Sequence, residues 1–182
     1  MGHKSRVGRA LTWLLVTITL ALVWLTRAGS RWPSVYYMTG ASMEPTIAAE
    51  RYFLAWSPPG NPNRGALVIF RYQEGDSVFH VLRRLAAVAG DTISMREGVA
   101  VVNGRPQSWG FRIIEREASK SALARGENLY TWGPWVVPQD SVFLLADTRD
   151  IIGWPDSRFL GPIPRSDIVA HATRTVRGAR LR

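Results

Sequence analysis

The sequence contains no cysteine, few histidines and almost no lysine. Without cysteine the chain can form no disulfide framework, no thiol nucleophile and no thiolate zinc site. The three histidines lie far apart, at positions 3, 80 and 171, and this spacing argues against a metal centre. Because the sequence also shows no nucleotide- or cofactor-binding pattern, we expect neither a metal nor another cofactor.

The charge is strongly basic and is carried almost entirely by arginine. The formal net charge is +9, and only Lys4 and Lys120 among the 23 basic residues are lysines. Basic residues cluster at the two ends, over 3–9 and 174–182, and are scattered in between. Charge alone gives only non-specific affinity for nucleic acid, and no nucleic-acid-binding motif accompanies it. We expect the basic ends to lie at an anionic membrane surface or in solvent, and we expect no nucleic-acid partner.

An uncharged segment near the N-terminus predicts a membrane anchor. Residues 10–26 (ALTWLLVTITLALVWLT) carry no charge, and a helix of this length measures about 25 Å, near the lower limit for a membrane span. Trp13 and Trp24 lie near its ends, where aromatic side chains meet membrane interfaces. The slight excess of basic residues in front predicts that residues 1–9 are cytoplasmic and that the body of the chain is exported.

A cleaved signal peptide is the alternative for this segment, because its basic start and apolar core are equally typical of one. The residues at its end, Thr26, Arg27 and Ala28, place a bulky charge where a cleavage site requires small side chains. The sequence therefore favours a retained anchor over a removed leader.

Residues 33–171 predict a mostly β, antiparallel domain. Short apolar or alternating runs are separated by turn signals, and no strand–helix alternation indicates a parallel sheet. A hairpin turn is expected at Glu97-Gly98. The more polar stretch 109–135 contains helix formers and is interpreted as a small inserted lobe, and 172–182 is interpreted as a basic tail. The expected strands are Tyr52–Trp56, Ala66–Tyr72, Val78–Val88, Thr92–Met95, Val99–Val102 and Val142–Ala146.

Ser42 is the candidate nucleophile. It stands in the segment MTGASMEPTI, residues 38–47, between Gly40 and Pro45. The glycine permits a tight turn and the proline fixes the backbone, so the serine hydroxyl can be held exposed in a defined direction. On local chemistry alone, an ordinary turn or a helix N-cap explains the serine at least as well.

Four further segments follow in order along the chain, and together they favour the nucleophile over an ordinary turn for Ser42. Together with the S-M-x-P-T box they resemble the type I signal peptidases, membrane-bound serine proteases that remove signal peptides from exported proteins. The resemblance covers about residues 37–167 and the position of the anchor. It implies the antiparallel β fold of that family on a single transmembrane helix, residence in the cell membrane with the catalytic domain on the exported side, and exported precursors and membrane lipid as partners. The segments are RGALVIFR (64–71), RRLAAVAGD (83–91), DTRD (147–150) and DSRFLGP (156–162).

The resemblance implies catalysis by a Ser–Lys dyad. Ser42 would attack the scissile carbonyl, while a desolvated, neutral lysine takes its proton and returns it to the leaving amine. The N–H of Ser42 would be an oxyanion donor, and Gly40 lies where the family places supporting contacts. Counting back from Gly90, however, Arg83 occupies the position of the family's lysine. A guanidinium has a pKa above about 12 and cannot act as an ordinary base.

His80 is the alternative base, because the endoplasmic-reticulum members of the superfamily use histidine in place of lysine. It lies three positions before Arg83, and residues three apart on a regular strand face opposite sides of the sheet. A bulge or a shift in register is therefore needed to bring His80 to Ser42. Without one, His80 is a half-exposed strand histidine.

The last two segments supply the supporting charges that the resemblance implies. Asp147, Arg149, Asp156 and Arg158 match charged members of the family's pattern, although their neighbours depart from its usual Gly-Asp-Asn-Arg. Their expected role is to pair and hydrogen-bond beneath the site, where they position the base.

These residues leave three functions open. The first is a serine endopeptidase that removes signal peptides, with Ser42 as nucleophile and an unconventional base. The second is a catalytically impaired homologue that binds or scaffolds precursors, and Arg83 motivates it. The third is a maturation peptidase of conjugation pili from the same superfamily. By resemblance, apolar strands near 52–56 and 66–70 are expected to form shallow pockets for small substrate side chains.

Overall fold

A computed structural model describes residues 3–27, 32–57, 59–125, 127–150 and 155–175. The chain falls into two compact units, Met1–Trp32 and Pro33–Arg182. We describe each unit by itself.

The first unit is the single helix α1 (His3–Arg27). From Gly8 to Trp24 its side chains are exposed, including Trp13 at 69% and Trp24 at 70%. In the described part of the chain, no helix combines the length and apolar character that a membrane crossing requires. The predicted membrane span over 10–26 is therefore not supported by the structure.

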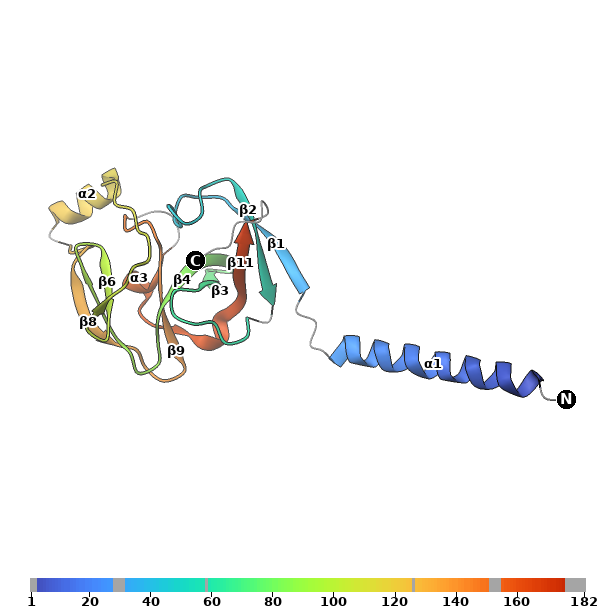
Figure 1. The fold of residues 1–182 in the computed structure, drawn as a ribbon. Helices are drawn as coiled ribbons and strands as arrows, with labels where there is room; N and C mark the ends of the chain where they lie inside the picture. Colours follow the sequence, from blue (N-terminus) through green and yellow to red (C-terminus); the bar gives the residue numbers. More distant parts are fainter. Residues whose placement is uncertain (1–2, 28–31, 58, 126, 151–154, 176–182) are drawn as a thin grey trace. The chain divides into compact units, whose positions relative to one another are not determined.

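The second unit contains two sheets (Figure 1). The larger sheet has the strand order β1-β2-β11-β3-β4-β9-β10, and the smaller has the order β7-β6-β5-β8. From β2 onward the paired strands with a defined register are antiparallel. The predicted mostly antiparallel β architecture is thus confirmed. The larger sheet comprises β1 (Trp32–Met38), β2 (Arg51–Ser57), β3 (Leu67–Glu74), β4 (Ser77–Val88), β9 (Ser141–Leu145), β10 (Ile163–Pro164) and β11 (Ile168–Thr175).

The smaller sheet and three short helical segments complete this unit. The six strands expected from the sequence are all present within two residues of their predicted ends. The Glu97-Gly98 hairpin turn is also present, with positive φ at both residues (49° and 83°). The remaining elements are β5 (Thr92–Arg96), β6 (Val99–Val102), β7 (Arg105–Pro106), β8 (Trp132–Val136), α2 (Glu117–Ala124), α3 (Ser157–Leu160) and a 3₁₀ turn (Arg165–Asp167).

Strand β8 of the smaller sheet was not predicted from the sequence, and its composition explains why. It contains Gly133 and Pro134, which mark breaks in a sequence pattern. Proline is tolerated because β8 is an edge strand of its sheet and need not donate on its outer side. Gly133 has φ +90°, and a Cβ there would lie 2.9 Å from the Ile93 carbonyl oxygen. The stretch 109–135 is therefore not wholly a separate lobe, because its last residues belong to the smaller sheet.

The long strand β4 positions the centre of the unit. Its first part pairs with β3, with Arg83 opposite Val68 and Arg84 opposite Leu67, and its second part pairs with β9. Apolar clusters pack around it, so its residues 81–87 are buried. Two adjacent arginines thus lie in the most enclosed part of the sheet, each 1% exposed.

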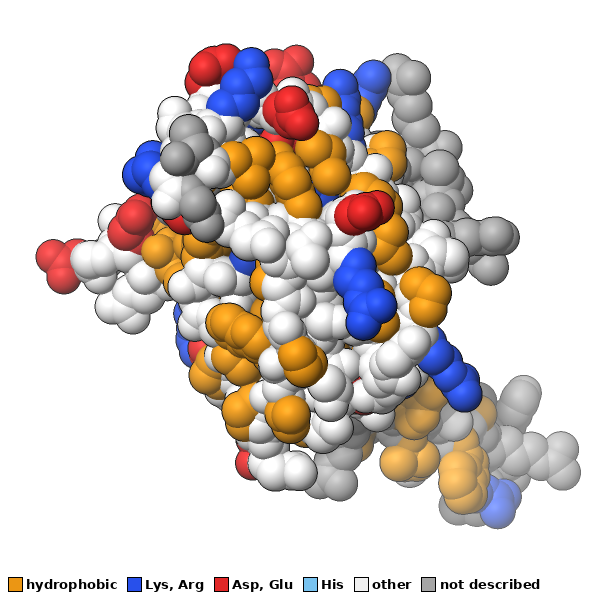
Figure 2. All heavy atoms as spheres, turned by 90° about the vertical axis from the view of Figure 1, so that its left-hand side faces the viewer, with side chains coloured by type: hydrophobic (Ala, Val, Ile, Leu, Met, Phe, Trp, Pro, Cys, Tyr) orange, Lys and Arg blue, Asp and Glu red, His pale blue; other side chains and the backbone are white. Residues whose placement is uncertain are grey.

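The side of this unit that carries the smaller sheet has a mixed surface (Figure 2). Apolar side chains are interspersed with charged ones of both signs. At the end where α2 lies, the exposed Glu117 and Lys120 form an ion pair with Nζ and Oε1 2.9 Å apart. The positive charge of the chain therefore does not form a continuous patch on this face.

Candidate active site

Ser42 lies in a turn between β1 and β2 that is fixed at both sides. Met43 and Ile47 are buried at 0% and 1% exposure and anchor the turn in the core. The Ile47 N–H donates to the Met43 carbonyl at 2.8 Å. On its other side the turn is held by Thr148, whose N–H donates to the Ser42 carbonyl at 3.0 Å and whose hydroxyl donates to the Ala41 carbonyl at 2.6 Å. The position of the serine is thus set by the buried residues of its own turn and by Thr148, which lies far along the chain.

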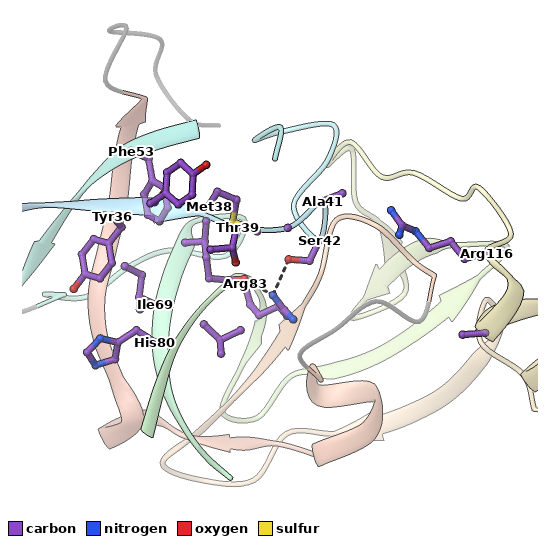
Figure 3. A pocket seen from close by; sticks show the side chains of 15 residues that line it. Tyr36, Met38, Thr39, Ala41, Ser42, Phe53, Ile69, His80, Arg83 and Arg116 are labelled. Carbon is purple, nitrogen blue, oxygen red and sulfur yellow. Dashed lines mark hydrogen bonds between the residues drawn. The ribbon is translucent and has the colours of Figure 1, made fainter. Parts of the chain in front are cut away.

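The structure brings Ser42 and Arg83 together. The Nη1 of Arg83 donates to the Ser42 hydroxyl at 3.1 Å and to the Leu82 carbonyl at 2.6 Å. Both side chains line a cavity of about 550 Å³ (Figure 3). Ser42 is 9% exposed and Arg83 is 1% exposed. The one side chain at the position of the family's base is therefore in direct contact with the candidate nucleophile.

The contact between the two is that of a cation with a hydroxyl oxygen. Burial lowers the pKa of the Arg83 guanidinium to about 10, an effect that the Asp156 carboxylate opposes. At neutral pH the group is still almost entirely protonated, and a protonated guanidinium has no lone pair to accept a proton. Arg83 can hold the serine oxygen and favour a negative charge on it, but at neutral pH it cannot remove the hydroxyl proton.

His80 lines the same cavity but is not placed at the nucleophile. Its ring packs edge-on against Tyr36, with ring centroids 6.3 Å apart, and Figure 3 shows both on the side of the cavity away from Ser42. The pairing of β4 with β3 is regular from residue 77 to 84, so the bulge that His80 would need is not present there. His80 therefore lies three residues from Arg83 on a regularly paired strand, without the shift in register that would bring it to Ser42.

The backbone around Ser42 is open to the cavity. In the described part of the chain the Ser42 N–H has no hydrogen-bond acceptor. Gly40 lines the cavity, and a Cβ at its position would meet no atom within 4 Å. An N–H without an internal partner beside a serine hydroxyl suits the stabilisation of a negatively charged oxygen.

Asp147 forms a buried ion pair, but with Arg84. The Nε and Nη2 of Arg84 donate to its two carboxylate oxygens at 2.7 and 2.5 Å. The Thr46 hydroxyl also donates to Asp147 at 2.5 Å. The pair is 1% and 0% exposed, and it fastens the Ser42 turn to β4. The sequence placed Asp147 beneath the site but assigned no role to Arg84 or Thr46.

The other three predicted supporting charges form a separate group. Arg149 donates to the carbonyls of Gly98 (2.9 Å) and Ala146. Asp156 pairs with Arg158 at 3.0 Å and accepts the Ala146 N–H at 2.9 Å. Burial alone would raise the pKa of the Asp156 carboxyl, but the guanidinium groups of Arg158 and Arg83 and the Ala146 N–H together hold the pKa below its ordinary value. These groups brace the loop after β9 and do not touch Ser42.

Asp150 is a buried residue that the sequence did not single out for a role. Its carboxylate accepts the N–H groups of Ile114 and Arg116 at 2.7 and 3.3 Å and the Tyr130 hydroxyl at 3.1 Å. It thereby holds the segment before α2 against the loop that follows β9. This segment brings Arg116 to the rim of the cavity that contains Ser42. Only its position directly after Asp-Thr-Arg could have drawn notice to it.

Among the described residues, no group of three His, Cys, Asp or Glu side chains could hold a metal ion. The exposed Lys120 pairs with Glu117 on α2 and is not among the side chains that line the cavity. The groups in contact at Ser42 are therefore its hydroxyl, the buried Arg83 guanidinium and the backbone N–H of the turn.

Comparison with known proteins shows which family this chain is similar to. A family model described as signal peptidase, peptidase S26, matches residues 10–176. A signal peptidase I P from Bacillus subtilis subsp. natto is 32% identical over 173 residues, which cover 92% of this chain and 89% of that protein. A signal peptidase I from Bacillus licheniformis is 32% identical over 140 residues, 75% of this chain and 70% of that protein. A crystal structure of a signal peptidase I from Enterococcus faecalis V583 shares 20% identity and a TM-score of 0.42, covering 60% of this chain and 95% of that chain.

The sequence matches define the class of this protein as a serine endopeptidase. The family match extends over most of the chain, and the Bacillus subtilis relative is similar along nearly its whole length. This chain belongs to the signal peptidase family, peptidase S26.

Proposed function

We propose that this protein removes signal peptides from exported precursors, with Ser42 as the nucleophile and Arg83 as the side chain that holds its hydroxyl. The observation that carries the proposal is the 3.1 Å contact between Arg83 Nη1 and Ser42 Oγ inside a cavity. Arg83 stands at the base position of a family whose relatives are named signal peptidase I.

In the proposed reaction the Ser42 oxygen loses its proton and bonds to the scissile carbonyl carbon. The carbonyl oxygen becomes negatively charged and faces the Ser42 N–H. Collapse of this intermediate breaks the C–N bond, the leaving amine takes up a proton, and water then hydrolyses the acyl-enzyme. The apolar side chains of Met38, Ile69 and Leu82 line the cavity and would hold the substrate residues that precede the cut.

The first step requires a group that accepts the serine proton. The protonated Arg83 lowers the cost of a negative charge on Ser42 Oγ, but it accepts no proton. Its neutral form can accept one, and with a pKa of about 10 this form is rare at neutral pH. While the pH is below the pKa, the neutral fraction of Arg83 increases tenfold for each unit by which the pH rises. Cleavage should therefore be slow at neutral pH and faster in alkaline solution.

The expected pH profile tests this function. The full chain in detergent is incubated with a synthetic precursor that has small residues before the cut, from about pH 7 to about pH 11, on either side of the arginine pKa. We expect kcat/KM to rise about tenfold per pH unit and to level off near pH 10, and Ser42→Ala to cleave nothing at any pH. A profile that continues to climb would point to hydroxide as the base. Cleavage by Ser42→Ala equal to that of the wild type would show that another residue is the nucleophile.

A catalytically impaired homologue is the second candidate, and Arg83 at the base position favours it. Such a protein would use the same cavity to bind precursors without cutting them. Binding of the labelled precursor by the wild type, with no cleavage at any pH in the series, would establish this alternative.

We further propose that α1 attaches the protein to the membrane, with its basic start in the cytoplasm and the catalytic unit on the exported side. The apolar side chains of α1 support this, since large ones such as Leu15 (57%) and Leu22 (57%) are exposed. Burying such side chains in lipid is favourable by about 1.5–3 kcal/mol each.

The attachment is tested by membrane fractionation. We expect the wild type to sediment with membranes and to resist extraction at alkaline pH, and Leu15→Glu/Leu22→Glu to move into the soluble fraction. Val78→Glu is the matched control, because Val78 is an equally exposed apolar residue (56%) of the second unit. Protection of the N-terminus from added protease distinguishes crossing of the membrane from attachment to one face. Retention of the double variant on the membrane would contradict the attachment by α1.

A further inference from the structure

The cavity that contains Ser42 has an excess of positive charge. Its lining includes the guanidinium groups of Arg83 and Arg116, and among the described residues that line it there is no aspartate or glutamate. Arg83 is committed to Ser42 and to the Leu82 carbonyl. Arg116 is therefore the cationic side chain of the cavity that is available to a bound substrate.

The backbone of Arg116 is held in place. Its N–H donates to the Asp150 carboxylate at 3.3 Å, and Asp150 is 1% exposed. Four residues earlier, Arg112 exchanges backbone hydrogen bonds with the loop after β9, donating to the Asp147 carbonyl at 2.9 Å and accepting from the Arg149 N–H at 2.8 Å. The segment that carries Arg116 is thus fixed to the same loop that holds the Ser42 turn.

Among the described residues, nothing pairs with the guanidinium of Arg116. In the described part of the chain it meets no acceptor within hydrogen-bonding distance, and the residue is exposed. Of its two acidic neighbours, Glu117 pairs with Lys120 at 2.9 Å, and neither Glu115 nor Glu117 lines the cavity. A fixed backbone with an unsatisfied planar donor is suited to bind a carboxylate.

Figure 3 shows Arg116 on the opposite side of Ser42 from the apolar side chains Tyr36, Met38 and Ile69. If those apolar side chains hold the residues before the cut, Arg116 faces the residues after it. We propose that Arg116 is a specificity-determining residue that favours precursors with an acidic side chain shortly after the scissile bond. This inference rests on the proposed peptidase function of the same cavity.

Binding to a non-cleaving form of the full chain tests the inference separately from turnover. Fluorescent peptides with small residues before the cut carry either Asp or Asn at the first, second or third position after it, and their affinity for Ser42→Ala is measured in detergent by fluorescence anisotropy. At one of these positions we expect Asp to bind about three- to fivefold more tightly than Asn, as for a solvent-accessible ion pair. This preference should shrink at high salt.

The variants Arg116→Gln and Arg125→Gln, each made in the Ser42→Ala protein, are compared next. Arg125 is in the same part of the chain, pairs with Glu127 at 2.7 Å and does not line the cavity, so its removal controls for the general loss of one positive charge. We expect Arg116→Gln to bind Asp and Asn peptides equally and Arg125→Gln to keep the preference. Equal binding of the two peptides by Ser42→Ala, or a preference that survives Arg116→Gln, would overturn the inference alone. Failure of every peptide to bind would overturn the proposed function together with it.

Discussion

Replacing Arg83 with lysine is expected to raise cleavage at neutral pH by about a hundredfold or more. Although burial lowers its pKa to about 10, the Arg83 guanidinium stays almost entirely protonated at pH 7 and offers no lone pair. A lysine starts from an ordinary pKa of about 10.4, and complete burial lowers such a pKa by up to about 3–5 units. Since position 83 is 1% exposed, a large share of the lysine amines would be neutral and able to accept the Ser42 proton.

The measurement compares initial rates of precursor cleavage at pH 7 for the wild type, Arg83→Lys and Arg83→Met. The methionine variant removes the charge without supplying a base, so a rate increase that depends on proton transfer should appear in the lysine variant alone. Circular dichroism checks that the variants are folded. If Arg83→Lys is no faster than Arg83→Met, position 83 does not supply the base. If the wild type cleaves no precursor at all, the protein is the catalytically impaired homologue.

Replacing Arg84 with methionine is expected to destabilise the fold by about 3–5 kcal/mol, although Arg84 does not contact Ser42. Its carboxylate partner Asp147 is 0% exposed, and a buried charge that loses its partner retains the cost of desolvation. Urea unfolding followed by tryptophan fluorescence measures the loss. Because the Thr46 hydroxyl also depends on this pair, the Ser42 turn should loosen as well.

Arg71→Met is the matched control for this prediction. Arg71 lies on β3 and pairs with Asp167 at 3.3 Å, but its side chain is 53% exposed, so its removal should cost less than about 1 kcal/mol. The double variant Arg84→Met/Asp147→Leu should recover part of the stability, since it leaves no buried charge. Equal losses of unfolding free energy for Arg84→Met and Arg71→Met would show that the buried Arg84–Asp147 pair stabilises the fold no more than the exposed pair does.

The family resemblance singled out Ser42 and Arg83 as site residues, and the structure brings the two into contact. The strands β2 to β6 and β9 followed from alternation and turn residues, because those signals are local. Strand β11 was missed, since it is held by pairing with β2 and β3, more than 90 residues earlier in the sequence. Such pairing depends on the whole sheet and leaves little trace in the strand itself.

The partners of the buried charges could not be predicted for a similar reason. Asp147 was expected to pair and hydrogen-bond beneath the site, but no partner was assigned to it. Adjacent residues of a strand face opposite sides, and this places Arg84 where Asp147 can reach it. Asp150 and Arg116 are brought together by the path of the chain across residues 112–116. Neither arrangement follows from spacing along the sequence.

The hydrogen bonds around Ser42 form a closed circuit. It runs from Ser42 through Arg83 to β4, from the neighbouring Arg84 to Asp147, and from the adjoining Thr148 back to the Ser42 carbonyl. Hydrogen bonds in such a network strengthen one another, so each link restrains the same small group of residues. The reactive geometry should therefore persist up to the temperature at which the sheets themselves come apart, and thermal loss of activity should be abrupt and cooperative instead of gradual.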